Sequence, residues 1–296
     1  MLIESCWCQN PQQRPSFNDI VESIRANKDF IAKMVNQDEF HCFIDHIEDK
    51  NKRATSKQFR KVSIDSKLFE KVDSIEAIEK VEFLDLSLFE KQSLVSQDSC
   101  YKTYQVKSKE TGTFCSATCS RVQIEKLNQD EILNLKSEVT ITSQLNHPSF
   151  LKLFGCCPFD FHGKRRPVIV SELASNGRLS SLLESERKGR HFSEFNETKK
   201  LIIIYGIAAG MAYLHSCGIL HRNLNPSSIY LDSCLFPKIG DLCFTSLKKK
   251  MLESMIFQPT EGSRVDQYYS SPEVLNSKDY SKSSEVYSFS LIVYEI

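Results

Sequence analysis

The sequence has no excess of charge of either sign. Lys and Arg together number 38 among the 296 residues, and Asp and Glu together also number 38, so the formal net charge is zero. A neutral chain has no overall field with which to hold the polyanionic backbone of a nucleic acid or an anionic membrane surface. We therefore expect no nucleic-acid partner and no membrane partner, and recognition that depends on local sites.

Long apolar runs and a leader-like start are also missing. The longest apolar run, residues 201–214, contains Gly206 and Gly210, and it is shorter than the ~20 residues that a bilayer requires. It predicts a core helix. The first residues, MLIESC, do not place a basic region before an apolar core, so the sequence gives no sign of a secretory leader. These features favour a cytoplasmic protein.

Cysteines are frequent, but they are not arranged as metal ligands. The chain has 11 cysteines, an odd number, and none belongs to a paired CxxC knuckle. The pairs closest to such a pattern are Cys6 and Cys8, Cys115 and Cys119, and Cys156 and Cys157. No histidine nearby completes a zinc set. We expect reduced thiols that pack as small apolar side chains.

Three parts follow one another along the chain. In residues 1–25, Asn10 and Pro11 mark a turn between two short helical patterns. Residues 26–80 begin with apolar residues at helical spacing over 27–48, which predicts a stripe that packs against a neighbouring lobe. They continue with the polar, basic stretch 49–66, which is typical of a solvated linker. Residues 81–296 carry the main domain.

The main domain begins with strand patterns and ends with helical ones. The turn at 110–112 lies between two strand patterns and predicts a hairpin. Helices are predicted over 129–144 and 198–216, with Gly218 as the stop of the second, and strands over 150–154 and 168–171. Strands at one end and helices at the other predict an α+β, two-lobed protein.

Several longer motifs then occur in a fixed order. They are LNHPSFLKLFG at 145–155, VIVSEL at 168–173, YLHSCGILHRNLNPSSIYLD at 213–232, KIGDLC at 238–243, SPE at 271–273 and EVYSF at 285–289. In this order they resemble a protein kinase, and their wording is most similar to the tyrosine-kinase-like (TKL) group of serine/threonine kinases. The resemblance implies a small β-rich lobe over about 86–172 and a truncated helical lobe over about 173–296.

Residues 1–25 resemble the last two helices of the same fold. This implies the tail of a preceding kinase unit in a tandem, joined by the helical and basic linker to a second unit. A second arrangement stays open, in which the N-terminal segment folds back on the helical lobe. The resemblance would then pair Arg14 with Glu273. Without covering helices, Phe289, Leu291 and Val293 are expected to be exposed, which invites partners.

Phosphoryl transfer depends on positioning and charge neutralisation, so residue types at a few positions decide activity. The family covers the phosphates with a glycine-rich loop, because only glycine lets backbone N–H groups approach so closely. The resemblance places Ser96, Asp98 and Tyr101 at the three glycine positions. None is glycine, and Asp98 would set a negative charge beside the phosphates.

The lysine of the third strand is also replaced. Its position corresponds to Thr118, whereas the glutamate with which the family pairs it is retained as Glu138. Without that cation, we expect Glu138 to be an ordinary surface acid.

The catalytic loop keeps the residues that hold its backbone in the family, but it lacks those that take part in phosphoryl transfer. His221 and Arg222 match the family, but the catalytic aspartate corresponds to Asn223, which cannot act as a base. The loop lysine corresponds to Asn225 and the metal-binding asparagine to Ser228.

Asp241 is then the only matched magnesium ligand, and one carboxylate does not hold two metal ions against phosphate. The resemblance also implies that Glu285 replaces the aspartate that anchors the backbone of residues 221–222.

The expected adenine pocket is altered as well. The resemblance places Ser116 and Thr103 where the family has a small alanine and a valine, and Glu172 and Leu173 at the hinge. Tyr230 stands at the floor, where its ring would compete for the volume of the nucleotide.

Taken together, the replacements favour a pseudokinase, a binding or regulatory module whose partners are other protein kinase domains or signalling proteins. No cofactor is expected, although ATP and Mg²⁺ would be the ligands if nucleotide binding is retained. A divergent ATP-dependent serine/threonine kinase that uses Asp241 is the enzyme alternative. A relic without an independent role is the third reading.

Overall fold

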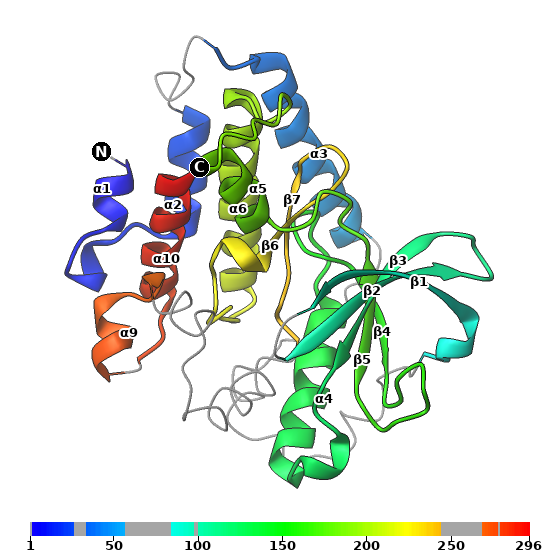
Figure 1. Cartoon of the computed structure of the whole chain (residues 1–296). Coiled ribbons are helices and arrows are strands. Elements are labelled where there is room, and N and C mark those ends of the chain that lie inside the picture. The colour runs from blue at the N-terminus through cyan, green and yellow to red at the C-terminus, as the bar shows by residue number, and fades with distance from the viewer. Residues whose placement is uncertain (1, 27–33, 57–83, 98–99, 244–267, 278) are drawn as a thin grey trace.

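The computed structural model has two lobes, one built mainly of strands and one of helices (Figure 1). It describes residues 2–26, 34–56, 84–97, 100–243, 268–277 and 279–296. The predicted α+β, two-lobed architecture is confirmed. Asp98 lies outside the described residues, as does most of the predicted basic linker. No described helix has the length and apolar character needed to cross a membrane.

The small lobe is an antiparallel five-stranded sheet with strand order β1-β2-β3-β5-β4. Its strands are β1 (Phe89–Gln97), β2 (Tyr101–Ser108), β3 (Phe114–Ser120), β4 (Leu153–Cys157) and β5 (Val168–Glu172). Short 3-10 helices, η5 (Leu86–Leu88) and η6 (Ile124–Lys126), flank it. The predicted hairpin joins β2 and β3, and Gly112 takes a φ of 70° in its turn, a conformation that costs glycine little.

Two apolar clusters cover the two faces of this sheet. On one face Cys115, Ala117 and Cys119 pack with Val168 and Val170. On the other face the side chains meet α4 (Gln129–Gln144) in the second cluster. The N-cap Asn128 begins α4 with a capping box, because its side chain accepts from the Glu131 N–H and the Glu131 carboxylate accepts from the Asn128 N–H. The predicted helix over 129–144 is thus confirmed with its bounds.

The helical lobe is arranged around α6 (Glu197–Ser216), which is apolar on all sides and largely buried. It contacts α10 (Lys282–Glu295) and the hairpin of β6 (Ile229–Leu231) and β7 (Pro237–Ile239). The lobe also contains α5 (Leu179–Arg187), the 3-10 helix η7 (Pro226–Ser228) and α9 (Pro272–Ser277). Gly218, with a φ of 75°, follows α6 as predicted.

The N-terminal helices lie on this same lobe (Figure 1). They are α1 (Leu2–Cys6), η1 (Pro11–Gln13), α2 (Phe17–Ala26) and α3 (Gln37–Ser56). The structure therefore has the arrangement in which the segment folds back, and Arg14 forms an ion pair with Glu273 at 2.6 Å. Of the stripe predicted over 27–48, residues 27–33 lie outside the described residues. In the described part Phe40, Phe43 and Ile47 are buried in the main core as expected, whereas Met34 is 80% exposed.

Residues 49–56 of the predicted basic linker continue α3, because lysine and arginine are good helix formers. Two expectations about the fold were wrong. The strand predicted over 150–154 begins at Leu153, and Phe150 makes only an isolated bridge to Ile239. Phe289 is 2% exposed rather than open to solvent, because the ring of Phe17 packs edge-on against it at 5.3 Å.

We predict that Phe17→Ala lowers the free energy of unfolding by about 3 to 5 kcal/mol, since it empties a fully buried aromatic site between the N-terminal helices and α6. Urea unfolding followed by circular dichroism measures the loss. The matched control is Phe159→Ala, at a ring that is 46% exposed. Equal effects of the two changes would contradict the packing of α2 on the lobe.

His147 gives the fold a pH dependence. Its ring stacks on Tyr213 at 5.1 Å, and burial lowers its pKa to about 4, against about 6.5 in an unfolded chain. At pH values between these two, the imidazole binds a proton in the unfolded state but not in the folded state. The free energy of unfolding therefore falls as the pH drops from about 6.5 to about 4, by up to about 1.4 kcal/mol per pH unit.

His147→Phe keeps the stacked ring, and we expect it to flatten part of this slope in unfolding measured from pH 4 to 8. Some slope remains, since burial also lowers the pKa of His221. Replacing the exposed His162 by Phe is the control. A slope that is the same in both variants would refute the assignment.

Candidate functional site

The predicted catalytic loop is held by a neutral buried histidine. His221 is 2% exposed, and burial lowers the pKa of its imidazole. Its Nε2 lies 2.9 Å from the carbonyl oxygen of Gly240, and its Nδ1 lies 3.3 Å from the backbone nitrogen of Asn223. A carbonyl only accepts, so Nε2 carries the hydrogen and Nδ1 accepts from Asn223. His221 thereby ties the loop to the segment that contains Asp241.

Glu285 anchors the next residue of the loop. The backbone N–H of Arg222, a residue with a φ of 63°, donates to the Glu285 Oε1 at 2.6 Å. The other carboxylate oxygen accepts from the His215 Nε2, also at 2.6 Å. The expectation that Glu285 anchors this backbone is confirmed, and the strained conformation of Arg222 is held by a buried acceptor.

The replaced loop residues bond to one another. The Asn225 side chain accepts from the Ser227 N–H at 2.8 Å and donates to the backbone and side-chain oxygens of Asn223 at 3.0 and 3.1 Å. The Ser228 hydroxyl donates to the Asn225 carbonyl oxygen at 2.8 Å. Asn225 and Ser228 are 2% and 0% exposed. Both cap η7, so these side chains serve the loop's own structure.

The carboxylate of Asp241 is bound within the chain. The Arg178 Nη1 donates to its Oδ2 at 2.8 Å, and the Tyr230 hydroxyl donates to its Oδ1 at 2.8 Å. The same Nη1 reaches the carbonyl oxygen of Ser227. A charged guanidinium therefore lies against the carboxylate to which the sequence resemblance assigns magnesium binding.

Tyr230 completes this arrangement from the floor. The Arg178 guanidinium carbon lies 4.5 Å from the centre of its ring, which is the geometry of a cation–π contact. On its other side the ring meets Gly240 so closely that a Cβ there would lie 2.6 Å from a ring carbon. Arg178, Tyr230 and Asp241 form what we term the Asp241 cluster.

The sheet brings the other predicted positions to one face. Thr118 and Ser116 alternate with the buried Cys115, Ala117 and Cys119 along β3, so they point away from the outer cluster.

The Thr118 hydroxyl lies 3.2 Å from the hydroxyl of Thr103 on β2, and Ser116 lies 3.5 Å from Ser171. Among the glycine positions, Ser96 pairs with Thr103 across β1 and β2, and Tyr101 begins β2.

Glu138 is not the surface acid that the sequence predicted. It is only partly exposed on α4, and its Oε2 is shielded from solvent. The thiol of Cys243 donates to its backbone oxygen at 3.8 Å. Exposure of this side chain is decided by tertiary packing, which the sequence motif does not report.

The carboxylate at the predicted hinge is bonded within the chain. The Glu172 Oε1 accepts from the backbone N–H of Lys152 at 2.9 Å and lies 3.5 Å from the Lys238 Nζ. Leu173, the following residue, is half-buried after β5 ends. The Glu172 carboxylate therefore links β5 to the start of β4 and to β7.

Comparison with known proteins identifies the fold. The family described as protein tyrosine and serine/threonine kinase matches residues 105–296, which is more than half of the chain. The chain belongs to the protein kinase family.

Individual relatives of the chain are named as protein kinases and come from several organisms. The chain is 26% identical over 205 residues to a putative serine/threonine-protein kinase A of Trypanosoma brucei brucei, covering 69% of this chain and 45% of the relative. It is 29% identical over 194 residues to an Aurora kinase of Yarrowia lipolytica, covering 66% and 47%. A wall-associated receptor kinase-like 20 of Arabidopsis thaliana is 32% identical over 190 residues, covering 60% and 27%. The chain spans less than half the length of each of these relatives.

Among the described residues, the side chains at the predicted nucleotide and metal positions are not arranged as a donor set for ATP and Mg²⁺. Within the described residues no three His, Cys, Asp or Glu side chains are grouped so as to hold a metal ion. Thr118 replaces a cation, Ser228 is committed to η7, and both oxygens of Asp241 accept hydrogen bonds from within the chain. Residues of this kind do not fit a bound Mg–nucleotide.

Arg178 is the residue of this site that sequence reasoning missed. Its signal is weak, because it stands 63 positions before Asp241 and belongs to no catalytic motif of the sequence. It reaches the site through tertiary contacts, among them an isolated bridge to Tyr230.

We predict that the Arg178–Asp241 pair has a coupling free energy of about 0.5 to 1 kcal/mol, because both side chains are partly screened from solvent. A double-mutant cycle of Arg178→Ala and Asp241→Ala in urea unfolding measures it. The control cycle uses Arg165 and Glu125, a pair that is about half exposed at each side chain. If the two substitutions at the first pair are additive, with a coupling free energy no larger than that of the control pair, a structural role for the Asp241 cluster is contradicted.

Proposed function

We propose that the chain is a pseudokinase of the tyrosine-kinase-like group, a catalytically inactive binding or regulatory module in signalling. The observation that carries the proposal is the Asp241 cluster, in which Arg178 and Tyr230 bond to the carboxylate that would bind magnesium in an active kinase. We place the module in the cytoplasm, and its partners are other kinase domains or signalling proteins.

The loss of the general base supports this proposal independently. An asparagine amide has no proton-accepting carboxylate, and the side chain of Asn223 accepts a hydrogen bond from Asn225. Removing one preorganised electrostatic group costs about 10² to 10³ in rate. Here the base, the β3 cation and the metal site are altered together, so residual transfer would be slow even though such effects are not additive.

The contacts that hold the predicted catalytic loop and the helical lobe in place remain intact. His221 is bonded to Gly240, and Arg222 is bonded to Glu285, while α6 stays buried in the lobe. A kinase fold that keeps its packing and loses its donor groups presents a shaped, rigid surface. That combination suits a module which works by binding.

We expect thermal unfolding of the purified chain to be unchanged by millimolar Mg–ATP. A ligand at 100 times its Kd would add about 2.7 kcal/mol to the stability of the folded state, so binding with a Kd well below the ATP concentration is visible as a rise in Tm. Asp241→Ala is the matched variant, because it removes the one matched metal ligand.

A transfer assay with labelled ATP and a general protein substrate completes the test. We expect no incorporation above that of Asp241→Ala. The retained carboxylate of Asp241 favours the second candidate, a divergent ATP-dependent serine/threonine kinase. A Tm shift and a transfer rate that both disappear in Asp241→Ala would establish that candidate and refute the pseudokinase.

A further inference from the structure

The helices before residue 57 form a unit that docks on the helical lobe. We call residues 2–26 and 34–56 the N-terminal block. Its apolar side chains enter the main core, where Phe17, Ile20 and Phe40 are at most 1% exposed. The partner surface is mainly α6 with part of α10, as the neighbouring ribbons in Figure 1 show. The contact is therefore a core interface, not a loose surface contact.

One close approach shows how specifically the two surfaces fit. At Gly206 on α6, an added Cβ would lie 2.4 Å from Pro237 of β7 and 3.1 Å from the ring of Phe43 on α3. The ring of Phe43 also packs against Phe236 at 4.6 Å. A glycine is required at this point of α6 for α3 and β7 to approach together. The surface of the helical lobe is thus shaped to pack against α3.

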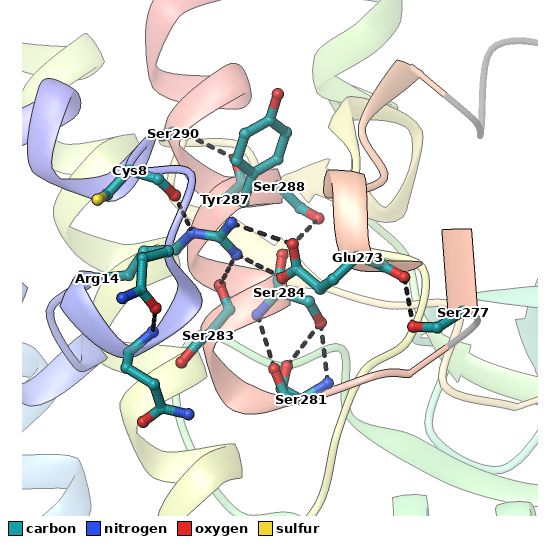
Figure 2. A network of polar contacts seen from close by, with 12 residues as sticks. Cys8, Arg14, Glu273, Ser277, Ser281, Ser283, Ser284, Tyr287, Ser288 and Ser290 are labelled. Atoms are coloured by element: carbon teal, nitrogen blue, oxygen red, sulfur yellow. Dashed lines mark hydrogen bonds and ion pairs between the residues drawn. The ribbon is translucent and has the colours of Figure 1, made fainter. Parts of the chain in front are cut away.

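A buried ion pair fixes the register of the block. The Arg14 Nη1 and Nη2 donate to Glu273 Oε1 and Oε2 at 2.6 and 3.1 Å, in a bidentate pair (Figure 2). The same guanidinium donates to the backbone oxygens of Cys8 at 2.8 Å and Ser283 at 3.1 Å. The Arg14 side chain is fully buried. Reversing either charge alone leaves two like charges facing each other at a buried site, which is strongly destabilising.

The connection between the block and the rest of the domain is long. Residues 57–83 separate α3 from the start of the small lobe, and a stretch of this length spans up to about 90 Å when extended. A folded domain of this size has a radius of gyration of about 16 Å. The connection is therefore long enough to reach the same docking surface on a neighbouring molecule.

We propose that the docking surface on α6 and α10 also accepts the N-terminal block of a second copy of this chain, so that two copies form a reciprocal, block-exchanged dimer. Every contact described above is kept in the exchange, and only the path of the connection changes. Because a tether raises the local concentration of the block, one chain closes on itself at low concentration and exchange increases with concentration. The proposal does not depend on whether the cleft binds ATP.

A charge-exchange experiment tests this directly on the full chain. Arg14→Glu and Glu273→Arg are prepared as separate variants with different affinity tags. Each alone sets like charges against each other in its own closed form. When the two are co-expressed, an exchanged dimer restores opposite charges at both sites. In it the block of the Arg14→Glu variant meets the lobe of the Glu273→Arg variant, and the block that keeps Arg14 meets the lobe that keeps Glu273.

We expect capture through one tag to recover the other variant in equal amount, with the mass of two chains in analytical ultracentrifugation. The control is the double variant Arg14→Glu with Glu273→Arg in one chain. It restores the pair without exchange and is expected to stay a stable monomer at low concentration.

Co-expressed variants that remain separate monomers, or that fail to fold while the double variant folds, would overturn the proposal. A dimer formed by either single variant alone would also overturn it, since it would use another surface. A second experiment mixes wild-type chains that carry the two tags at high concentration. If neither these chains nor the co-expressed variants are captured together, exchange is excluded.

Discussion

The buried carboxylate of Glu285 is the interaction on which the rest of the domain depends. It holds the backbone of Arg222 on one oxygen and the imidazole of His215 on the other, so α10, α6 and the catalytic-like loop meet at one group. A buried charge is tolerated only when its oxygens are satisfied, and here both are. From the other side, the ring of Phe17 packs edge-on against His215 at 5.1 Å. The N-terminal block, the helical core and the loop that would carry out catalysis therefore share one junction.

The polar side chains of the predicted catalytic site are likewise bonded within the chain. In a site that performs chemistry, side chains are held with their donors and acceptors directed at the substrate. Here Asn225 and Ser228 cap η7, and the oxygens of Asp241 accept from Arg178 and Tyr230. Internal partners stabilise each of these groups in the folded chain, and a ligand would have to displace them at a cost in free energy. Such internal bonding is unfavourable for an enzyme, and it supports the proposed role of the chain as a binding module.

Much of the fold was predictable from local signals, and the errors show where those signals end. The hairpin at Gly112, the capped helix α4 and the apolar helix α6 depend on residues close in sequence, and they were predicted with nearly the observed bounds. The identities of the altered cleft residues were also readable, because a motif fixes their positions. The partner of Asp241 was not, since the guanidinium of Arg178 arrives from a distant segment. Glu138 and Phe289 were misjudged for the same reason: burial is decided by what packs on a side chain in three dimensions.

The fold-back of the N-terminal block illustrates how two such arguments combine. Sequence resemblance named the pair Arg14 and Glu273 and left two arrangements open, one within this domain and one with a preceding unit. The geometry within one chain satisfies the pair, with both charges hydrogen-bonded and the arginine excluded from solvent. An ion pair of this kind contributes more to the choice of partner surface than to net stability, because its attraction is offset by the cost of desolvating both groups. The stabilisation comes from Phe17, Ile20 and Phe40, and the ion pair determines where those side chains are placed.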